Sequence, residues 1–313
     1  MLTDVDLRGL KAVIAVAEEG TFLGAADVLH LTQSAVSQQI ARLEHTLGAA
    51  VFDRPGGPRP VTLTPVGEIV LRRARAVLAQ LDAGSQEIDA VIRGTGGRLR
   101  CGTFQSVSVH FLPVIIAELI KESPGLDVVI EEEIFNEELL RRLIDGEFDV
   151  AFHSLPINHP AIESIPLGSD PFVALLPTGS PLTPRSKNGA VKLAELASGS
   201  MIGEYDDQDL ALVEGAIRAL GIQPRYAFRT TDNGAVQAMV GAGLGAAIMP
   251  ELTLDANVPG VTRWPIDPPV PPRTLYVALP KDVRRTKAAE RFAHIAKHVG
   301  RERLQPVRAT ARA

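Results

Sequence analysis

The sequence has 313 residues, 45% hydrophobic and 22% charged, and its formal net charge is −5. This length exceeds one ordinary domain, so two or three units with their own cores are expected, and the acidic balance excludes a uniformly basic nucleic-acid-binding domain. The single cysteine excludes an intramolecular disulfide. The N-terminal stretch MLTDVDLRGLKAVIAVAEEG lacks a signal peptide's basic start, and no membrane span is evident, so we expect a cytoplasmic protein without a membrane partner.

Two short helices are predicted before residue 30. The first should cover residues 5–18 and end at Gly20, because four apolar residues share one helical stripe: Leu7, Leu10, Ile14 and Ala17. The second begins after Thr21 as its N-cap, and its apolar face consists of Phe22, Ala25, Ala26 and Leu29. The small alanines permit a close crossing with the next helix.

A third helix is predicted over residues 33–47. Its apolar residues recur at steps of four, three and four: Val36, Ile40, Leu43 and Leu47. Thr32 stands at the N-cap position and Gly48 at the position of a left-handed C-cap. Because only a few residues separate this helix from the one before it, the pair is typical of a helix-turn-helix.

The outer face of this third helix carries short polar side chains that suit DNA recognition. Ser34 and Gln38 lie on that face, with Ser37 and Arg42 on its flanks, and such groups bind base edges or phosphates in a major groove. Plain solvation of a polar helix face is the alternative. Residues 1–64 contain five Lys or Arg against seven Asp or Glu, so attraction to DNA must be local and depend on oligomeric presentation.

A hairpin is predicted after the third helix. Val51 and Phe52 form its first strand, the cluster PGGPRP at residues 55–60 forms the turn, and residues 61–63 return as the second strand. Leu63 is expected to close the small core. Residues 1–64 are therefore predicted as a winged helix-turn-helix DNA-binding domain.

The run LTQSAVSQQIARLEHTLGAAVFDR, followed by VTLTPVG, resembles the N-terminal signature of the LysR-type transcriptional regulators. The resemblance covers about the first seventy residues at motif level, and the remainder matches the family in length and element order. It implies that four residues enter the major groove: Gln33, Ser34, Ser37 and Gln38. It implies backbone contacts from Thr32 and Arg42, and contacts of the wing with the minor groove or phosphates from Arg54, Thr62 and Thr64. The wing tip is slightly longer than the family pattern, which adds Arg59.

From Pro65 the pattern changes to one long helix that continues to Arg93 without another proline. Small and apolar residues recur along it at heptad steps: Val70, Ala74, Val77, Leu81, Gly84, Ile88 and Val91. A helix lying on its own domain would also show such a seam. A surface seam beside a DNA-reading module favours dimerisation, as the resemblance also implies, so residues 65–93 are predicted as a dimerising linker helix.

Strands and helices alternate over residues 98–313. Strands are predicted at 98–101, 126–132, 148–152, 172–176, 201–203, 226–229, 246–249 and 274–279, and helices at 107–121, 137–145, 207–220, 234–240 and 285–299. This order favours an α/β fold of parallel sheets with crossover helices in two lobes. Lobe I should contain residues 98–168 and 268–300, and lobe II residues 169–267. The pair looks like the type 2 periplasmic-binding architecture with which the family senses small molecules.

Ligands in such folds bind where strand ends of the two lobes face each other. The predicted effector-binding residues lie at such positions: Thr103, Phe104, Gln105, Ser106, His153, Ser154, Glu204, Thr230, Thr231 and Asp232. Ser106 and Thr231 precede helices whose N-terminal amides would suit an anion, so a carboxylate is a candidate effector. Each hydroxyl would serve equally well as a helix cap, and only their convergence indicates a site.

The sequence contains no evident catalytic or metal-binding constellation, so neither an enzyme nor a cofactor is expected. A nucleophile elbow and a phosphate-binding GxxxxGK[ST] motif are both missing. His294 and His298 share a helix face without a third ligand. Cys101 precedes the candidate ligand loop and could sense redox state, although a lone cysteine in a strand is more often a small buried hydrophobe.

These features predict a sequence-specific transcriptional regulator that is controlled by a small-molecule effector between two α/β lobes. The resemblance implies a homodimer through the linker helix, a tetramer built as a dimer of dimers, double-stranded operator DNA as partner, and RNA polymerase as a further partner. The alternatives are a small-molecule binding protein and an enzyme on a two-lobed scaffold. The N-terminal DNA-reading segment argues against the first, and the lack of a catalytic constellation against the second.

Overall fold

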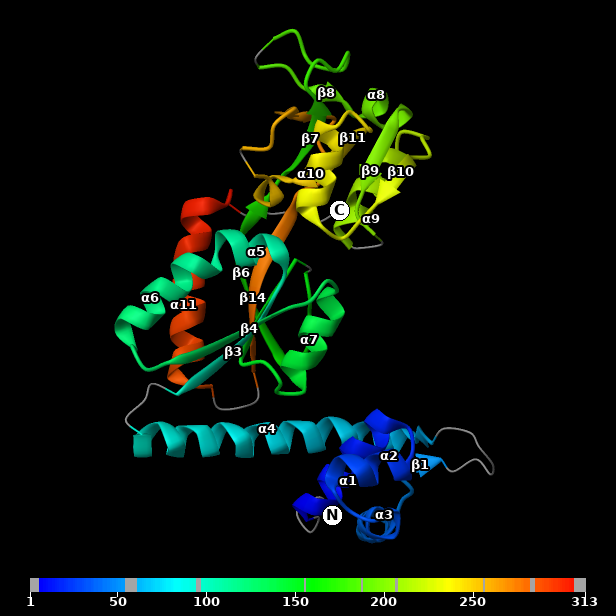
Figure 1. Ribbon diagram of the computed structural model, residues 1–313, viewed down its shortest axis with the longest axis vertical. Coiled ribbons are helices and arrows are strands. Elements are labelled where there is room, and N and C mark those ends of the chain that lie inside the picture. The colour runs from blue at the N-terminus through cyan, green and yellow to red at the C-terminus, as the bar shows by residue number, and fades with distance from the viewer. Residues whose placement is uncertain are drawn as a thin grey trace. The chain divides into compact units, whose positions relative to one another are not determined.

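The computed structural model describes residues 6–53, 61–93, 97–154, 156–186, 188–205, 208–255, 257–281 and 285–306. The chain divides into two compact units, one mainly of residues 1–94 and the other mainly of residues 95–313. The first unit is mostly helical, and the second contains two five-stranded sheets with helices on their faces (Figure 1). Among the described residues, no helix is long and apolar enough to cross a membrane.

The first unit is a winged helix-turn-helix built on the N-terminal part of a long helix. Its elements are α1 (Leu7–Glu19), α2 (Phe22–Leu29), α3 (Gln33–Leu47), β1 (Phe52–Asp53), β2 (Thr62–Leu63) and α4 (Pro65–Arg93). Side chains cap the first three helices: Asp6, Thr21 and Thr32 each accept a hydrogen bond from a first-turn N–H. Gly20 and Gly48 end α1 and α3 in the left-handed conformation, with φ of 64° and 70°. The predicted bounds and caps of α3 are confirmed.

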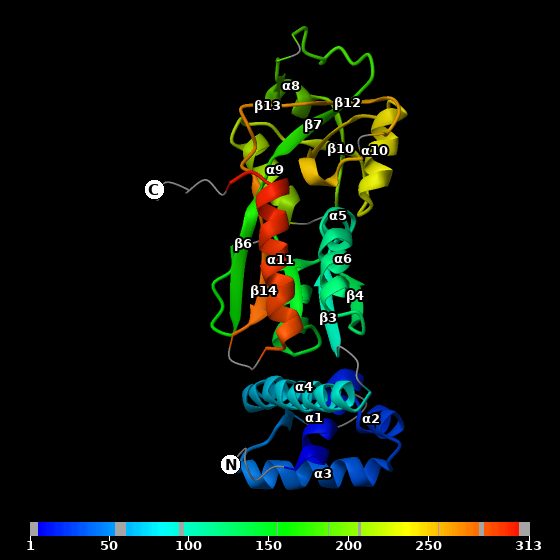
Figure 2. The same cartoon turned by 90° about the vertical axis from the view of Figure 1, so that its left-hand side faces the viewer.

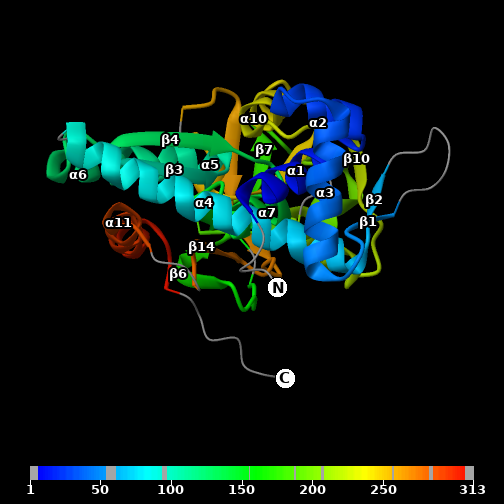
Figure 3. The same cartoon turned by 90° about the horizontal axis from the view of Figure 1, so that it is seen from below.

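The core of this unit combines the apolar stripes of the helices with the hairpin. Val36, Ile40 and Leu43 of α3 are buried in one cluster with residues of α1, α2, β1 and α4. β1 and β2 pair antiparallel with Phe52 opposite Leu63, and Figure 3 shows them side by side. Leu63 packs against the core as predicted. The outer face of α3 is therefore held on a rigid support.

The second unit begins with a mixed sheet of strand order β4-β3-β5-β14-β6. Its strands are β3 (Arg98–Thr103), β4 (Asp127–Glu132), β5 (Val150–His153), β6 (Ile162–Asp170) and β14 (Arg273–Pro280). β3 is parallel to β4 and β5, whereas β14 is antiparallel to β5 and β6. The expectation of a wholly parallel sheet is wrong for β14, because this strand re-enters the sheet from the opposite end after the chain has passed through the other lobe.

Helices cover both faces of this sheet. They are α5 (Gln105–His110), α6 (Leu112–Glu122), α7 (Asn136–Ile144) and α11 (Lys287–Arg303). Figure 2 shows α6 and α11 side by side over one face, and Figure 1 shows α7 on the other. The single helix predicted over residues 107–121 is wrong, because the chain breaks at Phe111 into α5 and α6. Pro113 explains the break, since it has no N–H to continue the helical bonding and crowds the preceding turn.

Strand β6 was not predicted from the sequence. It contains Pro166 and Gly168, which weaken a strand pattern. The strand lies at the edge of its sheet, beside β14 only, and an edge position tolerates proline because one row of its backbone groups needs no partner in the sheet.

The second lobe contains a sheet of order β10-β9-β11-β7-β12. Its strands are β7 (Phe172–Pro177), β9 (Ser200–Gly203), β10 (Arg225–Arg229), β11 (Ala246–Pro250) and β12 (Val261–Trp264), and its helices are α8 (Leu193–Ser198), α9 (Gln208–Arg218), α10 (Asn233–Gly241) and the short η2 (Glu251–Thr253). A small pair, β8 (Val191–Lys192) and β13 (Ile266–Asp267), completes it. This sheet is also mixed, because β7 is antiparallel to β11 and β12.

Both faces of this second sheet are buried. Ala174 and Leu176 of β7 pack in one cluster with α8 and α9, whereas Leu175 between them packs in another cluster with α10. Because side chains alternate along a strand and both faces are covered, the run FVALLP is apolar throughout. The short elements β8, α8, β12 and β13 were not predicted.

Two chain segments connect the two lobes. β6 ends at Asp170 and β7 begins at Phe172, and the chain returns between β13 and Arg273 at the start of β14. Asp170 and Arg273 are paired in register at this crossing. The crossing therefore brings residues that are far apart in the sequence to the boundary between the lobes.

Candidate functional site

The outer face of α3 presents polar groups to solvent. Exposed residues among the predicted DNA-binding positions are Thr32, Gln33, Ser34, Gln38 and Arg42, and Ser37 is half-buried. The Thr32 hydroxyl accepts from Ala35 N–H at 3.2 Å and lies 3.0 Å from the Ser34 hydroxyl, so the first turn is ordered. This face offers the amide, hydroxyl and guanidinium groups that bind base edges and phosphates.

The wing positions differ in what their side chains do. Thr62 is exposed on β2. The Thr64 hydroxyl donates to the Ala50 carbonyl oxygen at 2.7 Å and accepts from Gly67 N–H at 3.0 Å, so Thr64 caps the start of α4. The sequence pattern did not indicate this capping role. Arg54 and Arg59, also predicted to contact DNA, lie outside the described residues.

The seam predicted along α4 divides into two parts. Val70 and Ala74 are 3% and 0% exposed and belong to the core of the first unit. Contacts within the unit therefore occupy their side chains, which corrects the expectation that they face a second copy. Val77, Leu81 and Ile88 are 43%, 47% and 61% exposed. The side chain of Val91 lies outside the described part of the chain.

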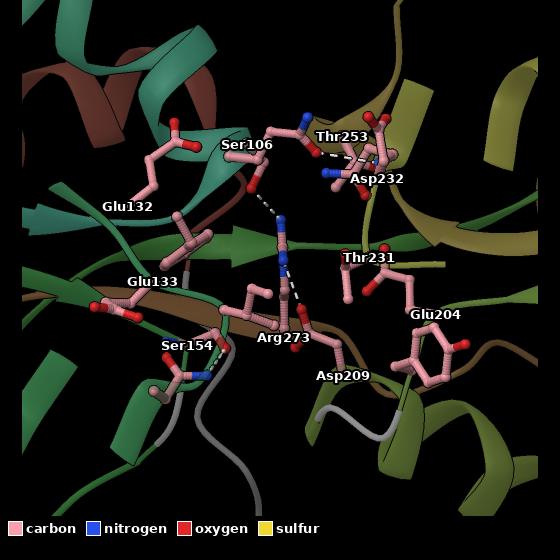
Figure 4. Close-up of a pocket in the computed structure, with 16 residues that line it drawn as sticks. Ser106, Glu132, Glu133, Ser154, Glu204, Asp209, Thr231, Asp232, Thr253 and Arg273 are labelled. Carbon is pink, nitrogen blue, oxygen red and sulfur yellow. Dashed lines mark hydrogen bonds and ion pairs between the residues drawn. The ribbon is translucent and has the colours of Figure 1, made fainter. Parts of the chain in front are cut away.

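A cavity of about 360 Å³ lies between the two lobes of the second unit (Figure 4). Seven of the ten predicted effector-binding residues line it: Phe104, Gln105, Ser106, Ser154, Glu204, Thr231 and Asp232. They come from the segments after β3, β5, β9 and β10, so the expectation that strand ends of both lobes converge holds for them.

Thr103, His153 and Thr230 are absent from the described lining, which corrects their assignment to it. Thr103 and His153 are fully buried within the first lobe, and His153 Nε2 lies 3.0 Å from Ser164 Oγ. The His153 ring stacks on Tyr276 with centroids 4.8 Å apart. Because successive side chains of a strand point to opposite faces, a residue beside the cavity in sequence can point away from it.

Arg273, which was not predicted, lies buried at the inner wall of the cavity with 4% of its surface exposed. Its Nε donates to Asp170 Oδ2 at 2.9 Å. Its Nη1 donates to Asp209 Oδ2 at 2.5 Å and its Nη2 to Ser106 Oγ at 3.0 Å (Figure 4). The three partners belong to β6, α9 and α5. One guanidinium thus ties elements of both lobes together.

Burial and charge act in opposite directions on this network. Burial would lower the pKa of Arg273, but the carboxylates of Asp209 and Asp170 outweigh it and raise that pKa, so the guanidinium stays charged. Burial raises the pKa of Asp170, while the Arg273 guanidinium and a hydrogen bond from Leu252 N–H oppose the rise. Asp170 is 1% exposed and Asp209 is 5% exposed.

Other lining residues were also not predicted. They are Glu132, Glu133, Ile134, Asn136, Tyr205, Asp209, Asn233 and Thr253. Glu132 and Glu133 lie at the end of β4, so the strand-end rule could have found them. Asn136 fixes the chain beside the cavity, because its Oδ1 accepts from Ser154 N–H at 2.9 Å and its Nδ2 donates to Ser154 Oγ at 3.2 Å. No sequence signal pointed to Arg273.

Protein groups occupy the donors expected to bind a carboxylate. Asn233 N–H, in the first turn of α10, donates to Gln105 Oε1 at 3.1 Å. Ala235 N–H donates to Asp232 Oδ1 at 2.9 Å, so a carboxylate of the chain itself caps this helix. Ser106 Oγ already accepts from Arg273. These contacts already engage donors that a bound carboxylate would use, and a carboxylate effector stays a prediction from the sequence.

Cys101 is fully buried in β3, and burial raises the pKa of its thiol. A buried neutral thiol behaves as a small hydrophobe, which favours the structural interpretation over redox sensing. Within the described residues, no group of three or more His, Cys, Asp or Glu side chains is arranged to hold a metal ion.

Known proteins resemble both units. Residues 7–68 match the model of the bacterial regulatory helix-turn-helix protein, lysR family, and residues 93–301 match that of the LysR substrate binding domain. The chain is 33% identical over 248 residues, 78% of each chain, to a probable hydrogen peroxide-inducible genes activator of Mycobacterium avium. It is 31% identical over 249 residues to the HTH-type transcriptional regulator AlsR of Bacillus subtilis, covering 79% of this chain and 80% of that protein. A full-length OxyR variant from Pseudomonas aeruginosa has a similar structure, with a TM-score of 0.66 and 25% identity, covering 94% of this chain and 98% of that one.

Proposed function

The chain belongs to the LysR family of transcriptional regulators, and from this premise we propose that it binds operator DNA through α3 and the wing under the control of a small molecule in the interlobe cavity. In this proposal residues 1–64 read DNA, residues 65–93 join two copies, and residues 98–313 bind the effector. The protein acts in the cytoplasm as a dimer of dimers, and RNA polymerase is a further partner.

The observation that carries the proposal is the two-sided character of α3. Val36, Ile40 and Leu43 fix one side in the core, and the other side exposes Gln38 and Arg42 beside the capped first turn. A helix held in this way can present the same side chains to a major groove each time it binds. Because the described face of α3 offers one arginine, each copy alone should bind weakly and paired copies should bind well.

An exposed apolar stripe on α4 supports pairing of two copies. Val66, Ile69, Val77, Leu81 and Ile88 follow one another at steps that keep them on one side of the helix, and each is at least 38% exposed. A stripe of this length is uncommon on a solvated helix and is typical of a helix that packs against a second helix.

The effector acts through the contacts that join the two lobes. Arg273 holds Asp170, Asp209 and Ser106, and Gln105 of α5 accepts from the first turn of α10. A molecule in the cavity would favour one arrangement of the lobes over another, because it touches both. A molecule that binds one arrangement more tightly than the other would shift the population of the two arrangements. This shift would change the affinity of the paired DNA-binding domains for their operator.

A ligand is favoured over an oxidant as the signal. The relative from Mycobacterium avium carries a name that refers to hydrogen peroxide. Here the single cysteine is buried and burial raises its thiol pKa, whereas peroxide reacts with accessible thiolates.

The test is to select binding sites for the full chain from a random duplex library and to measure affinity by fluorescence anisotropy. Gln38→Ala should weaken binding to the selected sequence by roughly tenfold to a hundredfold, because a well-placed amide contact to a base contributes about 1–3 kcal/mol. Gln223→Ala removes the same side chain from an exposed position in the second lobe, outside α3, the wing and α4, and should leave affinity unchanged. Equal affinity of parent and Gln38→Ala would refute the assignment of α3 as the reading helix.

A further inference from the structure

The interlobe cavity is strongly acidic. Among its described lining residues, Glu132, Glu133, Glu204, Asp209 and Asp232 carry carboxylates and Arg273 alone carries a positive charge, a formal excess of four negative charges (five minus one). Such an excess in a recess with protein walls repels anions and attracts cations, because field lines concentrate where water is partly excluded.

The positively charged Arg273 side chain already forms hydrogen bonds with other residues of the protein. All three nitrogens of the Arg273 guanidinium donate to protein acceptors, at 2.5–3.0 Å. Two of these acceptors, Asp170 and Asp209, are themselves negative, so the buried group as a whole carries one net negative charge. An anionic ligand at Arg273 would have to compete with these two buried carboxylates for the charge of the guanidinium and would add a third negative charge beside them.

A second cation close to the cavity is also shared between carboxylates. Arg142 lies on α7, and its Nη1 donates to Glu133 at 2.8 Å and its Nη2 to Glu131 at 2.6 Å. One guanidinium between two carboxylates leaves this group of three residues with one net negative charge. Arg142 therefore reduces the negative charge of this wall and does not reverse it.

The carboxylates stand on both walls. Glu132 ends β4 and Glu133 follows it in the first lobe, whereas Glu204 follows β9 and Asp232 precedes α10 in the second lobe. Figure 4 shows Glu132 and Glu133 on one side of Arg273 and Glu204 on the other. Like charges on facing walls repel each other, and a bound cation would relieve that repulsion and favour the arrangement in which the walls are close.

We propose that the effector is a small organic cation that carries amino or guanidino groups and bridges carboxylates of the two lobes. This inference rests on the proposed function of the cavity as the effector site and names the chemistry of its ligand. A volume of about 360 Å³ suits a short aliphatic amine. The half-exposed ring of Tyr205 adds an aromatic surface for a cationic head.

The experiment compares matched probes on the full chain by thermal shift and isothermal titration calorimetry. Putrescine and agmatine supply amino and guanidino groups, succinate supplies carboxylates on a chain of similar length, and butanediol is the neutral control. Putrescine or agmatine should raise the unfolding midpoint in proportion to the logarithm of concentration, and succinate and butanediol should not. Affinity for the amine should fall as salt is added, because the attraction is screened.

Isosteric variants separate the cavity from general charge effects. Glu132→Gln and Glu204→Gln should each weaken amine binding by about tenfold, which corresponds to losing one charge-assisted contact. Glu195→Gln removes the same charge from an exposed position of α8 outside the cavity and should bind like the parent.

Three results would overturn the inference: no response to either amine, a larger response to succinate than to putrescine, or equal weakening by Glu195→Gln. None of them affects DNA binding by α3. The anisotropy assay measures that binding in the absence of any effector, so a failed ligand inference and a failed regulator assignment are distinguishable.

Discussion

Replacing Arg273 with methionine tests whether the buried network holds the two lobes together. Methionine fills part of the same space with an unbranched apolar side chain. The substitution removes the positive charge that faces Asp170 and Asp209 and the donor that bonds to Ser106. Asp170 and Asp209 are 1% and 5% exposed, so two carboxylates would remain buried without a countercharge. We expect a large loss of stability in the second unit and little change in the first.

The size of the loss follows from the burial of the partners. Removing one member of a buried ion pair costs about 3–5 kcal/mol, because the remaining charge stays desolvated. With a urea dependence of about 2.5 kcal/mol per molar for a unit of this size, a loss of about 4 kcal/mol lowers the unfolding midpoint by roughly 1.5 M.

Trp264, the chain's single tryptophan, provides the signal for this assay. It lies in β12, and its Nε1–H donates to Thr262 Oγ1 at 3.1 Å. Arg263→Met on the same strand is the matched control, because Arg263 and Glu251 form a loose pair at 3.8 Å with side chains 63% and 44% exposed. Solvent screens such a pair, and its loss should cost less than about 0.5 kcal/mol.

Acid should reduce the defect of Arg273→Met. Burial raises the pKa of Asp170 above its ordinary value of 3.8, and removing Arg273 also removes a group that opposes this rise. A carboxyl group whose pKa is higher in the folded chain than in the unfolded chain lowers the free energy of unfolding. This loss is complete at pH values above the folded-state pKa, and it disappears as the pH falls to the unfolded-state pKa. The difference in urea midpoint between Arg273→Met and the parent should therefore become smaller as the pH is lowered. A midpoint equal to that of Arg263→Met near neutral pH, or a gap that widens in acid, would refute the reasoning.

Three further predictions concern other parts of the chain. Replacing both Val77 and Leu81 with lysine should split the oligomer, because both are exposed on α4 beyond its buried part, and an unchanged mass in sedimentation velocity would exclude this stripe from the interface. The Cys101 thiol should stay unreactive toward an alkylating reagent until urea unfolds the second unit, because burial raises its pKa, and labelling of the folded protein would contradict this. Ile40→Ala should cost about 3 kcal/mol, because Ile40 is fully buried and the change leaves a cavity, and a circular-dichroism melt with no fall in midpoint would contradict it.

The sequence alone determined the local elements of the DNA-binding unit. The bounds of α3 and α4 were predicted to the residue, because caps, proline and apolar spacing act over a few positions of the chain. These local signals did not predict features that depend on contacts with distant parts of the chain. Strand β6, with Pro166, is stable because β14 lies beside it, and the apolar seam of α4 did not reveal that Val70 and Ala74 belong to the core while Val77 stays exposed.

The same division applies to the ligand cavity. The strand-end rule found Ser106, Glu204 and Thr231 from the sequence, because the order of strands and helices sets which chain ends meet. Only the tertiary structure decided the charge of the cavity. It brings Arg273 against Asp209 and gathers carboxylates from four separate segments, and electrostatic preference depends on distances in space that spacing along the chain does not contain.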